Sequence, residues 1–492
     1  MTQVHRVLPP DPVRSLDDHI RRRGGRGLEI ARQVEPDALI DELEAAGLRG
    51  RGGAGFPTHI KWRTVRDFAS AVEGTTVVVN GAEGEPGTFK DRTILTRNPY
   101  EVIEGALIAA MAVGADRVVF GLKRSFGEVV TRVRSAIAEM DAAGWTGDIE
   151  VIAFEGPDEY LYGEETALLE AIDGRYPFPR LAPPYRRGVD EVVETEADAR
   201  SGSGQSSHVE MAGAFNETGA PPALVDNVET LANVPGIIAR GGNWFRTEGT
   251  DQSPGTIVCT VSGAVNHAGV AEFLMGTPLR EVIETIGGGV QGGHSIVGVL
   301  NGVSNSMLTP ADLDAPVSYE GLAAVGSGLG SAGFVVYDDR DDLVAAVAGV
   351  SRFLAVESCG QCTPCKQGGL ALSGLLDKLS RSAADERDLA AIHERVETVA
   401  DGARCFLASQ QEVVVRSLLD RFDDVVQGHL SGRITGVEPM LVSELVTIDD
   451  ETAVLDERHR TKQPDWTYGE SDSGQAPADR YGEHRAPTPL PE

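Results

Sequence analysis

The sequence predicts a multi-domain α/β chain in which a layered α/β domain, a small α+β module and a helical region follow one another. Short apolar, strand-like runs alternate with helical periodicity before residue 188, which is the pattern of a layered α/β domain. Over residues 256–337, short β-rich runs alternate with glycine-rich turns and one helical stretch at 278–286. From residue 341 to about residue 432, the apolar spacing is helical.

Each element of the first domain has a local signal. Residues 35–48 predict a helix, because a proline stands near its start and acidic residues fill its first turn. Residues 75–80 predict a short buried strand that ends in a glycine-rich loop. A helix at 100–113, a strand at 117–122 and a helix at 166–172 continue the alternation.

The composition divides the chain further. We expect an N-terminal arm at 1–34, an α/β domain at 35–253, an α+β module at 254–337, a helical domain at 338–432 and a tail at 433–492. Residues 188–222 are acidic, then rich in serine, glycine and proline, so they predict a surface insertion that buries little apolar area. The tail begins with a strand-like run at 440–448 and becomes polar, so roughly its last 30 residues are expected to be disordered.

The net charge of −31 excludes one class of partner. Nucleic-acid phosphates would be repelled by such a surface, so we expect no nucleic-acid partner. Because the acidic residues are spread along the whole chain, adaptation to a salt-rich cytoplasm is favoured over a local acidic docking face. Residues 1–26 lack the apolar core of a secretion signal, and no apolar run is long enough to span a bilayer. We expect a cytoplasmic protein, attached at most peripherally to the inner face of the cell membrane.

Four of the five cysteines suggest an iron–sulfur site. Cys359, Cys362 and Cys365 stand on one short loop, and Cys405 follows much further along. Three thiolates on a tight loop and a distant fourth suit a 4Fe-4S cluster, whereas a zinc site would more naturally divide its ligands into two pairs. Zinc and plain buried thiols are the alternatives. Cys259 is left in a strand-like apolar run, so a disulfide framework is not expected.

A glycine-rich loop at 50–55 formally satisfies the G-x-G-x-x-G pattern of dinucleotide-binding folds. Its context differs from that pattern, because a helix precedes it and Phe56-Pro57 follows it. Dense glycines still allow backbone N–H groups to converge on an anion, so a phosphate-bearing cofactor competes with a plain turn. Residues 83–92 add acceptors suited to sugar hydroxyls, and residues 160–166 add an aromatic ring and two carboxylates at the entrance to a helix.

Several segments in order then carry a resemblance to a known family. They are Gly47-Leu-Arg-Gly-Arg-Gly-Gly-Ala-Gly-Phe-Pro-Thr58, Glu85-Pro-Gly-Thr-Phe-Lys-Asp-Arg92, Gly163-Glu-Glu-Thr-Ala-Leu-Leu169, Asn227-Val-Glu-Thr-Leu-Ala232 and Glu357-Ser-Cys-Gly-Gln-Cys-Thr-Pro-Cys365. The chain resembles the NADH-oxidising flavoprotein subunit of respiratory complex I and the related diaphorase subunits of soluble hydrogenases and formate dehydrogenases. The resemblance implies a Rossmann-like domain for FMN and NADH, a ubiquitin-like β-grasp (SLBB) module and a helical 4Fe-4S domain.

The resemblance also implies site residues. The FMN contacts would be Gly50, Arg51, Gly52, Lys61, Asn80, Tyr160, Gly163, Glu164, Val225, Asn227 and Thr230, with Gly53 and Glu83 completing the cofactor-binding set. The NADH contacts would be Phe56, Glu85, Glu165 and Tyr185, and the cluster ligands would be the four cysteines. No side chain need act as an acid or base, since Glu85 and Glu165 would only orient NADH.

Departures from the family pattern leave alternatives open. Ala82, Gly84, Ala182 and Asp226 replace residues that the family usually has near the nucleotide. A relay or scaffold protein with a decayed NADH site is therefore one alternative. A chain similar to the C subunit of the Rnf electron-transport complex is another, although that protein is expected to carry two cysteine runs. The expected partner is a separate iron–sulfur subunit or a ferredoxin, because the chain lacks cysteines for a fused 2Fe-2S domain.

Overall fold

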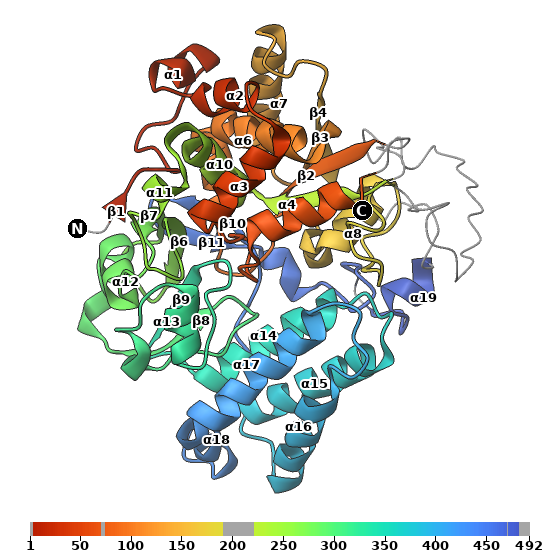
Figure 1. Ribbon diagram of the computed structural model, residues 1–492. Helices are drawn as coiled ribbons and strands as arrows, with labels where there is room; N and C mark the ends of the chain where they lie inside the picture. Colours follow the sequence, from red (N-terminus) through yellow and green to blue (C-terminus); the bar gives the residue numbers. More distant parts are fainter. Residues whose placement is uncertain (1–2, 70–73, 190–220, 470, 482–492) are drawn as a thin grey trace.

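A computed structural model describes residues 3–69, 74–189, 221–469 and 471–481 (Figure 1). The helices α14 to α18 occupy the opposite end of the molecule from α1 and α2, and the module that contains β6 to β9 lies beside the α/β domain. Most of the surface insertion expected at 188–222 lies outside the described residues. None of the helices in the described ranges combines the length and the apolarity that crossing a bilayer requires.

The α/β domain is built on a four-stranded parallel sheet with the strand order β4-β3-β2-β5. The N-terminal elements and this domain comprise β1 (Gln3–Val4), α1 (Leu16–Arg21), α2 (Arg26–Ala31), α3 (Pro36–Ala46), α4 (Thr58–Asp67), β2 (Thr75–Gly81), α5 (Lys90–Arg97), α6 (Pro99–Val113), β3 (Ala115–Lys123), α7 (Gly127–Ala142), β4 (Glu150–Gly156), η1 (Tyr160–Gly163), α8 (Glu165–Ile172), β5 (Ala223–Asn227), α10 (Val228–Arg240) and α11 (Gly242–Phe245). The helices and strands predicted in this region are confirmed to within a few residues at their ends.

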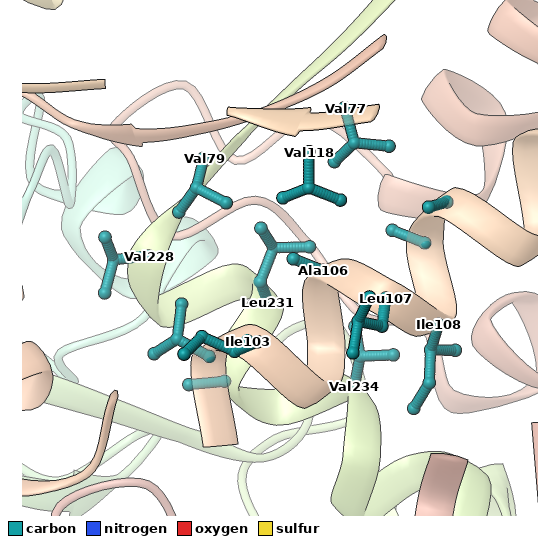
Figure 2. Packing of buried hydrophobic residues seen from close by; sticks show 14 of the residues in the cluster. Val77, Val79, Ile103, Ala106, Leu107, Ile108, Val118, Val228, Leu231 and Val234 are labelled. Atoms are coloured by element: carbon teal, nitrogen blue, oxygen red, sulfur yellow. The ribbon is translucent and has the colours of Figure 1, made fainter. Parts of the chain in front are cut away.

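The sheet is apolar on both faces, as expected for parallel strands covered by helices. Figure 2 shows one face, where the packed side chains are Val77, Val79, Val118, Ile103, Ala106, Leu107, Ile108, Val228, Leu231 and Val234. On the other face, Val78 and Val119 pack with Leu168 and Leu169 of α8. Apolar side chains therefore pack on both faces of the sheet, and polar residues stand at the carboxyl ends of its strands.

The second module is a five-stranded mixed sheet with the order β1-β7-β6-β9-β8. Its elements are β6 (Thr256–Gly263), β7 (Gly269–Leu274), α12 (Leu279–Gly287), η2 (Gln291–Gly293), β8 (Ile296–Asn301), η3 (Pro310–Asp312), α13 (Tyr319–Ala324) and β9 (Gly333–Asp338). β6 pairs in parallel with β9 and antiparallel with β7, and α12 packs on the sheet, as in a β-grasp module. The N-terminal arm adds its own strand, with Gln3 opposite Phe273, which the sequence did not indicate.

The helical domain contains α14 (Leu343–Glu357), the π-helix η4 (Pro364–Gly368), α15 (Gly369–Ser380), α16 (Glu386–Thr398), α17 (Leu407–Arg421) and α18 (Asp423–Leu430). Asp342 and Asp385 cap α14 and α16 by accepting hydrogen bonds from backbone N–H groups in the first turn. The first three cysteines follow the end of α14, and Cys405 stands just before α17. The cysteines of this domain thus stand at helix ends, after α14 and before α17.

The tail is ordered over much of its length. It forms β10 (Leu445–Asp449), β11 (Thr452–Leu455), η5 (Glu457–Arg460) and α19 (Pro477–Tyr481). The predicted strand at 440–448 begins only at Leu445, because the preceding residues pack on α14, where Met440 N–H donates to the Ala345 carbonyl at 2.9 Å. The expected disorder does not apply to the described residues up to 481, since Trp466 is only 1% exposed. Its indole is buried despite the polar sequence around it.

Candidate functional site

The carboxyl ends of β2 and β5 form the natural ligand-binding edge of the parallel sheet. The chain proceeds outward from β2 to β3 and β4 and then returns to place β5 on the other side of β2. Ligands of such sheets bind where the strand order reverses in this way. Asn80 and Asn227 lie opposite each other at this point, at the ends of the two neighbouring strands. The structure therefore brings these two predicted site residues together.

The two asparagines hold the loops around this edge. Asn80 Nδ2 donates to the Gly163 carbonyl at 2.9 Å. Asn227 caps α10 by accepting from the Glu229 N–H at 3.0 Å, and its Nδ2 donates to Asp91 at 2.7 Å. Both residues are partly exposed. They fix the loops of this edge and still face solvent, so a ligand could reach them.

The glycine-rich loop crosses the same edge. A Cβ atom at Gly52 would lie 3.2 Å from the Asn227 Cβ, so the loop approaches the strand end closely because it lacks side chains. Around Gly53, which has a φ of 140°, the space that a Cβ would take has no atom within 4 Å. Gly50 N–H is used internally, since it donates to the Phe56 carbonyl at 2.8 Å. The loop thus offers a close backbone approach with open space beside Gly53.

Arg51 differs from the other loop residues in its surroundings. Its guanidinium is fully buried and donates to the carbonyls of Arg49, Pro254 and Thr256 at 3.0 to 3.1 Å. Its backbone N–H donates to the Thr230 hydroxyl at 2.8 Å. In this structure Arg51 and Thr230 therefore anchor the loop, and the Arg51 guanidinium is bound by backbone carbonyls.

Lys61 reaches the edge from α4. Its ammonium pairs with Glu165, donates to the Val225 carbonyl at 2.6 Å and lies 3.9 Å from Asp226. Burial alone would lower the pKa of Lys61, but the two carboxylates raise it overall, so the lysine is charged. A cation, two acids and a backbone carbonyl of β5 thus meet at one point.

A cluster of buried charged residues in contact with Asn227 was not predicted from the sequence. Lys90 is fully buried and lies 2.7 Å from Asp91, 2.9 Å from Glu229 and 3.2 Å from the Asn227 amide oxygen. Burial, opposed by Lys90, raises the pKa of Asp91 to about 6. The only sequence signal for this cluster was the run of Lys90-Asp91-Arg92 beside a glycine turn.

Glu83 has a structural role. It accepts from the Asp91 N–H at 2.9 Å and from the Arg92 guanidinium at 2.8 Å, and it is buried. Glu83 therefore holds the start of α5 and is not directed at the strand ends. Its partner Arg92 also donates to the Leu445 carbonyl of the tail.

Glu85 and Tyr160 link the edge to the helical domain. The Tyr160 hydroxyl donates to Glu85 at 2.5 Å and accepts from the Gln410 amide at 2.9 Å. The other Glu85 oxygen accepts from the Val303 N–H at 2.8 Å and the Ser304 hydroxyl at 3.1 Å. Burial raises the pKa of Glu85 against these hydrogen bonds. Gln410, which sequence reasoning missed, stands on the helix that follows Cys405.

The remaining predicted residues are a helix cap, an exposed ring and a partly buried ring. Glu164 caps α8 through hydrogen bonds from the N–H groups of Thr166 and Ala167. Phe56 is 52% exposed, so its ring is free to stack. Tyr185 packs against Phe68 with ring centroids 5.1 Å apart.

The four predicted cysteines line one cavity. Its walls are Leu161, Pro179, Ser358, Cys359, Gln361, Cys362, Cys365, Ala403, Arg404, Cys405, Leu407 and Ala408. Arg404 N–H donates to the Cys362 sulfur at 3.4 Å, and the Ser358 hydroxyl lies 3.4 Å from the Cys365 sulfur. Burial raises the pKa of Cys405 to about 12, so the thiolate there requires cationic compensation. Iron ions would supply it.

The spacing of the sulfurs separates a cluster from a single metal ion. Four sulfurs around one tetrahedral zinc lie about 3.8 Å apart, given a zinc–sulfur distance of about 2.3 Å. In the described part of the chain, the cysteine sulfurs form no group of three within 4.8 Å of one another. A cubane has its iron atoms at separate corners and holds its ligands further apart. The pocket therefore fits a 4Fe-4S cluster better than zinc.

Comparisons with known proteins agree with this geometry. Residues 43–236 match the Nuo51 FMN-binding domain, residues 258–302 the SLBB domain and residues 345–429 the iron-sulfur binding region of NADH-ubiquinone oxidoreductase-F. The F subunit of NADH-quinone oxidoreductase from Mycobacterium bovis is 34% identical over 425 residues, which are 84% of this chain and 89% of that protein. The HndC subunit of the NADP-reducing hydrogenase from Solidesulfovibrio fructosivorans is 33% identical over 85% of this chain and 81% of its own.

A solved structure supports the fold. A chain of an NAD+-reducing [NiFe]-hydrogenase in the H2-reduced state superimposes with a TM-score of 0.69 at 31% identity. The match covers 82% of this chain and 64% of that chain. The expected fold class and the two expected cofactors, FMN and a 4Fe-4S cluster, are confirmed by the matched regions. The chain therefore belongs to the family of the NADH-quinone oxidoreductase F subunit, with an FMN-binding domain, an SLBB domain and a 4Fe-4S region.

Proposed function

We propose that the chain oxidises NADH and delivers the electrons to a separate iron–sulfur protein. When bound, FMN accepts a hydride from NADH and releases electrons singly, and a 4Fe-4S cluster carries one electron at a time. The protein would contribute binding, orientation and electrostatics. The single observation that carries the proposal is Tyr160, whose hydroxyl joins Glu85 on the nucleotide side to Gln410 on the cysteine side.

The FMN would be held at the edge formed by Asn80, Asn227 and the glycine-rich loop. The amides offer donors and acceptors to the polar edge of the flavin and to its ribityl chain. Backbone N–H groups near Gly53 and the Lys61 ammonium would meet the phosphate. Because Lys61 is now paired with Glu165, an incoming phosphate would compete for the same cation.

The NADH would be held by the residues on the open side of this edge. Phe56 offers an exposed ring for stacking on the adenine. Glu165, whose side chain is 42% exposed, would accept from a ribose hydroxyl once Lys61 turns toward the FMN phosphate. Three hydrogen-bond donors fix the Glu85 carboxylate, which would orient the nucleotide. None of these groups moves a proton in the hydride step.

The departures from the family pattern are compatible with this function. A Cβ at Gly84 would lie 2.8 Å from the Lys123 ammonium and 3.2 Å from Glu444, so the tail occupies the space of a larger side chain. Asp226 accepts from the Trp62 indole N–H at 2.6 Å, which gives it a buried role beside Lys61. Both positions thus have structural partners, which argues against decay of the site.

We further propose that the acceptor is an iron–sulfur protein of a larger complex and that any membrane attachment is through that complex. Cys362 and Cys405 are partly exposed, whereas Cys359 and Cys365 are buried. Electrons would therefore leave on the side of Cys362 and Cys405. Phe406, which is 64% exposed, provides an apolar contact on that side.

Anaerobic titration with NADH tests the function. The purified, iron-reconstituted protein is titrated while the flavin absorbance and then the low-temperature EPR signal of a reduced 4Fe-4S cluster are followed. Flavin bleaching followed by the cluster signal is the expected result. Bound flavin that NADH does not bleach would overturn the proposal and favour a relay protein.

A further inference from the structure

The C-terminal segment, defined here as residues 456–469 and 471–481, contacts the cysteine loop. It lies beyond the region matched to the iron–sulfur family, which ends at residue 429. Ala478 N–H donates to the Cys359 carbonyl at 2.9 Å, and Asp479 pairs with Lys366. Gly360 allows this approach, because a Cβ there would lie 2.1 Å from the Ala476 Cβ. The segment therefore contacts the loop that carries three of the cluster ligands.

The same segment places a buried lysine beside this loop. Lys462 is 3% exposed, and its ammonium donates to Glu357 at 2.7 Å. His459 Nε2 lies 3.1 Å from the same carboxylate oxygen. Glu357 is itself 3% exposed and stands two residues before Cys359. A buried carboxylate without a cation is costly, so Lys462 and Glu357 depend on each other.

The other oxygen of Glu357 faces the nucleotide side. It accepts from the Tyr160 N–H at 3.1 Å. The Tyr160 hydroxyl in turn donates to Glu85 at 2.5 Å. Glu357 therefore stands between the base of the cysteine loop and the residue that joins the two sites.

The position of Lys462 is itself fixed by backbone contacts. Arg352 donates to the carbonyls of His459, Arg460 and Lys462 at 3.0 to 3.2 Å. Further along, the Trp466 ring packs on Phe178, and the Tyr481 ring stacks on Tyr176, with centroids 5.6 and 4.6 Å apart. These contacts hold the Lys462 ammonium beside Glu357.

We propose that Lys462 is a positioning residue of the electron-transfer path, which neutralises Glu357 and thereby sets the charge beside the iron–sulfur site and holds Tyr160. The inference rests on the proposed function, in which the cysteine pocket carries electrons. Reduction adds one negative charge to a bound cluster. An unpaired Glu357 carboxylate would therefore disfavour reduction, and an unpaired Lys462 ammonium would favour it.

The test is a redox titration of the holoenzyme, with FMN and the cluster bound, followed by EPR at pH 8 with dithionite and mediators. Lys462→Met should shift the midpoint potential of the cluster to more negative values, and Glu357→Gln should shift it to more positive values. The double variant, in which both charges are removed, should return close to the wild-type value. Lys378→Met, which removes a lysine of the helical domain whose side chain is 47% exposed, is the control and should cause no shift.

The proposal would be overturned if both single variants shifted the midpoint potential in the same direction, or if the potential of the double variant did not return close to the wild-type value. A purely structural role of the two residues does not predict shifts of opposite sign. If the Lys462→Met protein does not retain its iron, the direction of the shift in midpoint potential is still measured with Glu357→Gln and with the double variant. The titration uses no NADH. A wild-type flavin that NADH does not bleach would therefore refute the proposed function and leave the assignment of Lys462 to be judged on the potentials alone.

Discussion

The edge formed by Asn80, Asn227 and the glycine-rich loop, where we propose that FMN binds, and the cysteine pocket neutralise charge in different ways. At the edge, the protein pairs its own charges, as Lys90 with Asp91 and Glu229 and Lys61 with Glu165. In the pocket, burial raises the pKa of the Cys359, Cys365 and Cys405 thiols, that of Cys405 to about 12, so bound iron would supply the charge that offsets their thiolates. We infer that the charges of the edge are paired without a ligand, whereas iron would complete the charge balance of the pocket.

The largest expected effect separates the two sites. Cys405→Ala removes one of the four ligands, so the iron content and the EPR signal of the cluster should be lost. NADH-dependent flavin bleaching should be retained, because the strand ends of β2 and β5 do not depend on the cysteine. Metal analysis, EPR and anaerobic absorbance spectra check this. Loss of flavin bleaching in the same variant would break the comparison.

The second effect tests the internal neutralisation of the edge. Lys90→Met leaves two buried carboxylates without their cation and should destabilise the α/β domain by about 3–5 kcal/mol. The measurement is urea unfolding of the FMN-free protein at pH 7.5. Lys378→Met, at an exposed site, should change the free energy of unfolding by less than about 0.5 kcal/mol. Equal effects of the two variants would contradict the role of Lys90.

The smallest effect concerns Asp226. Burial raises its pKa from 3.8 to about 6, against the opposing effects of Lys61 and the Trp62 hydrogen bond. Because the folded-state pKa is the higher one, the contribution of Asp226 to stability is present below about pH 4 and is lost as the pH rises through 6. Asp226→Asn should therefore be more stable than the wild type by about 1–3 kcal/mol at pH 8. Its advantage should disappear at pH 4.

Urea unfolding of both proteins at the two pH values measures this difference. Because the other titrating groups are common to both proteins, the difference isolates Asp226. An advantage that persists unchanged at pH 4 would show that the substitution acts through packing and not through the buried charge.

The cysteine pocket and the secondary structure of the α/β domain were predictable because their signals are local. Cys359, Cys362 and Cys365 are fixed by their spacing on one loop, and the strand Thr75–Gly81 has a run of three valines, Val77–Val79, before a glycine-rich loop. The tail was less predictable. Its polar composition suggested disorder, but Trp466 and Lys462 are buried by distant residues, Trp466 against Phe178 and Lys462 beside Glu357.

The sequence by itself determined the family, and it predicted the order of the domains along the chain and the four cysteines as cluster ligands, since these depend on short motifs whose meaning is set by spacing. Only the tertiary structure decided which charges meet. Lys90 with Glu229 and Lys462 with Glu357 join segments that are far apart in the chain. The sequence does not identify the partner of a buried lysine, because burial and charge pairing arise only where distant segments pack together.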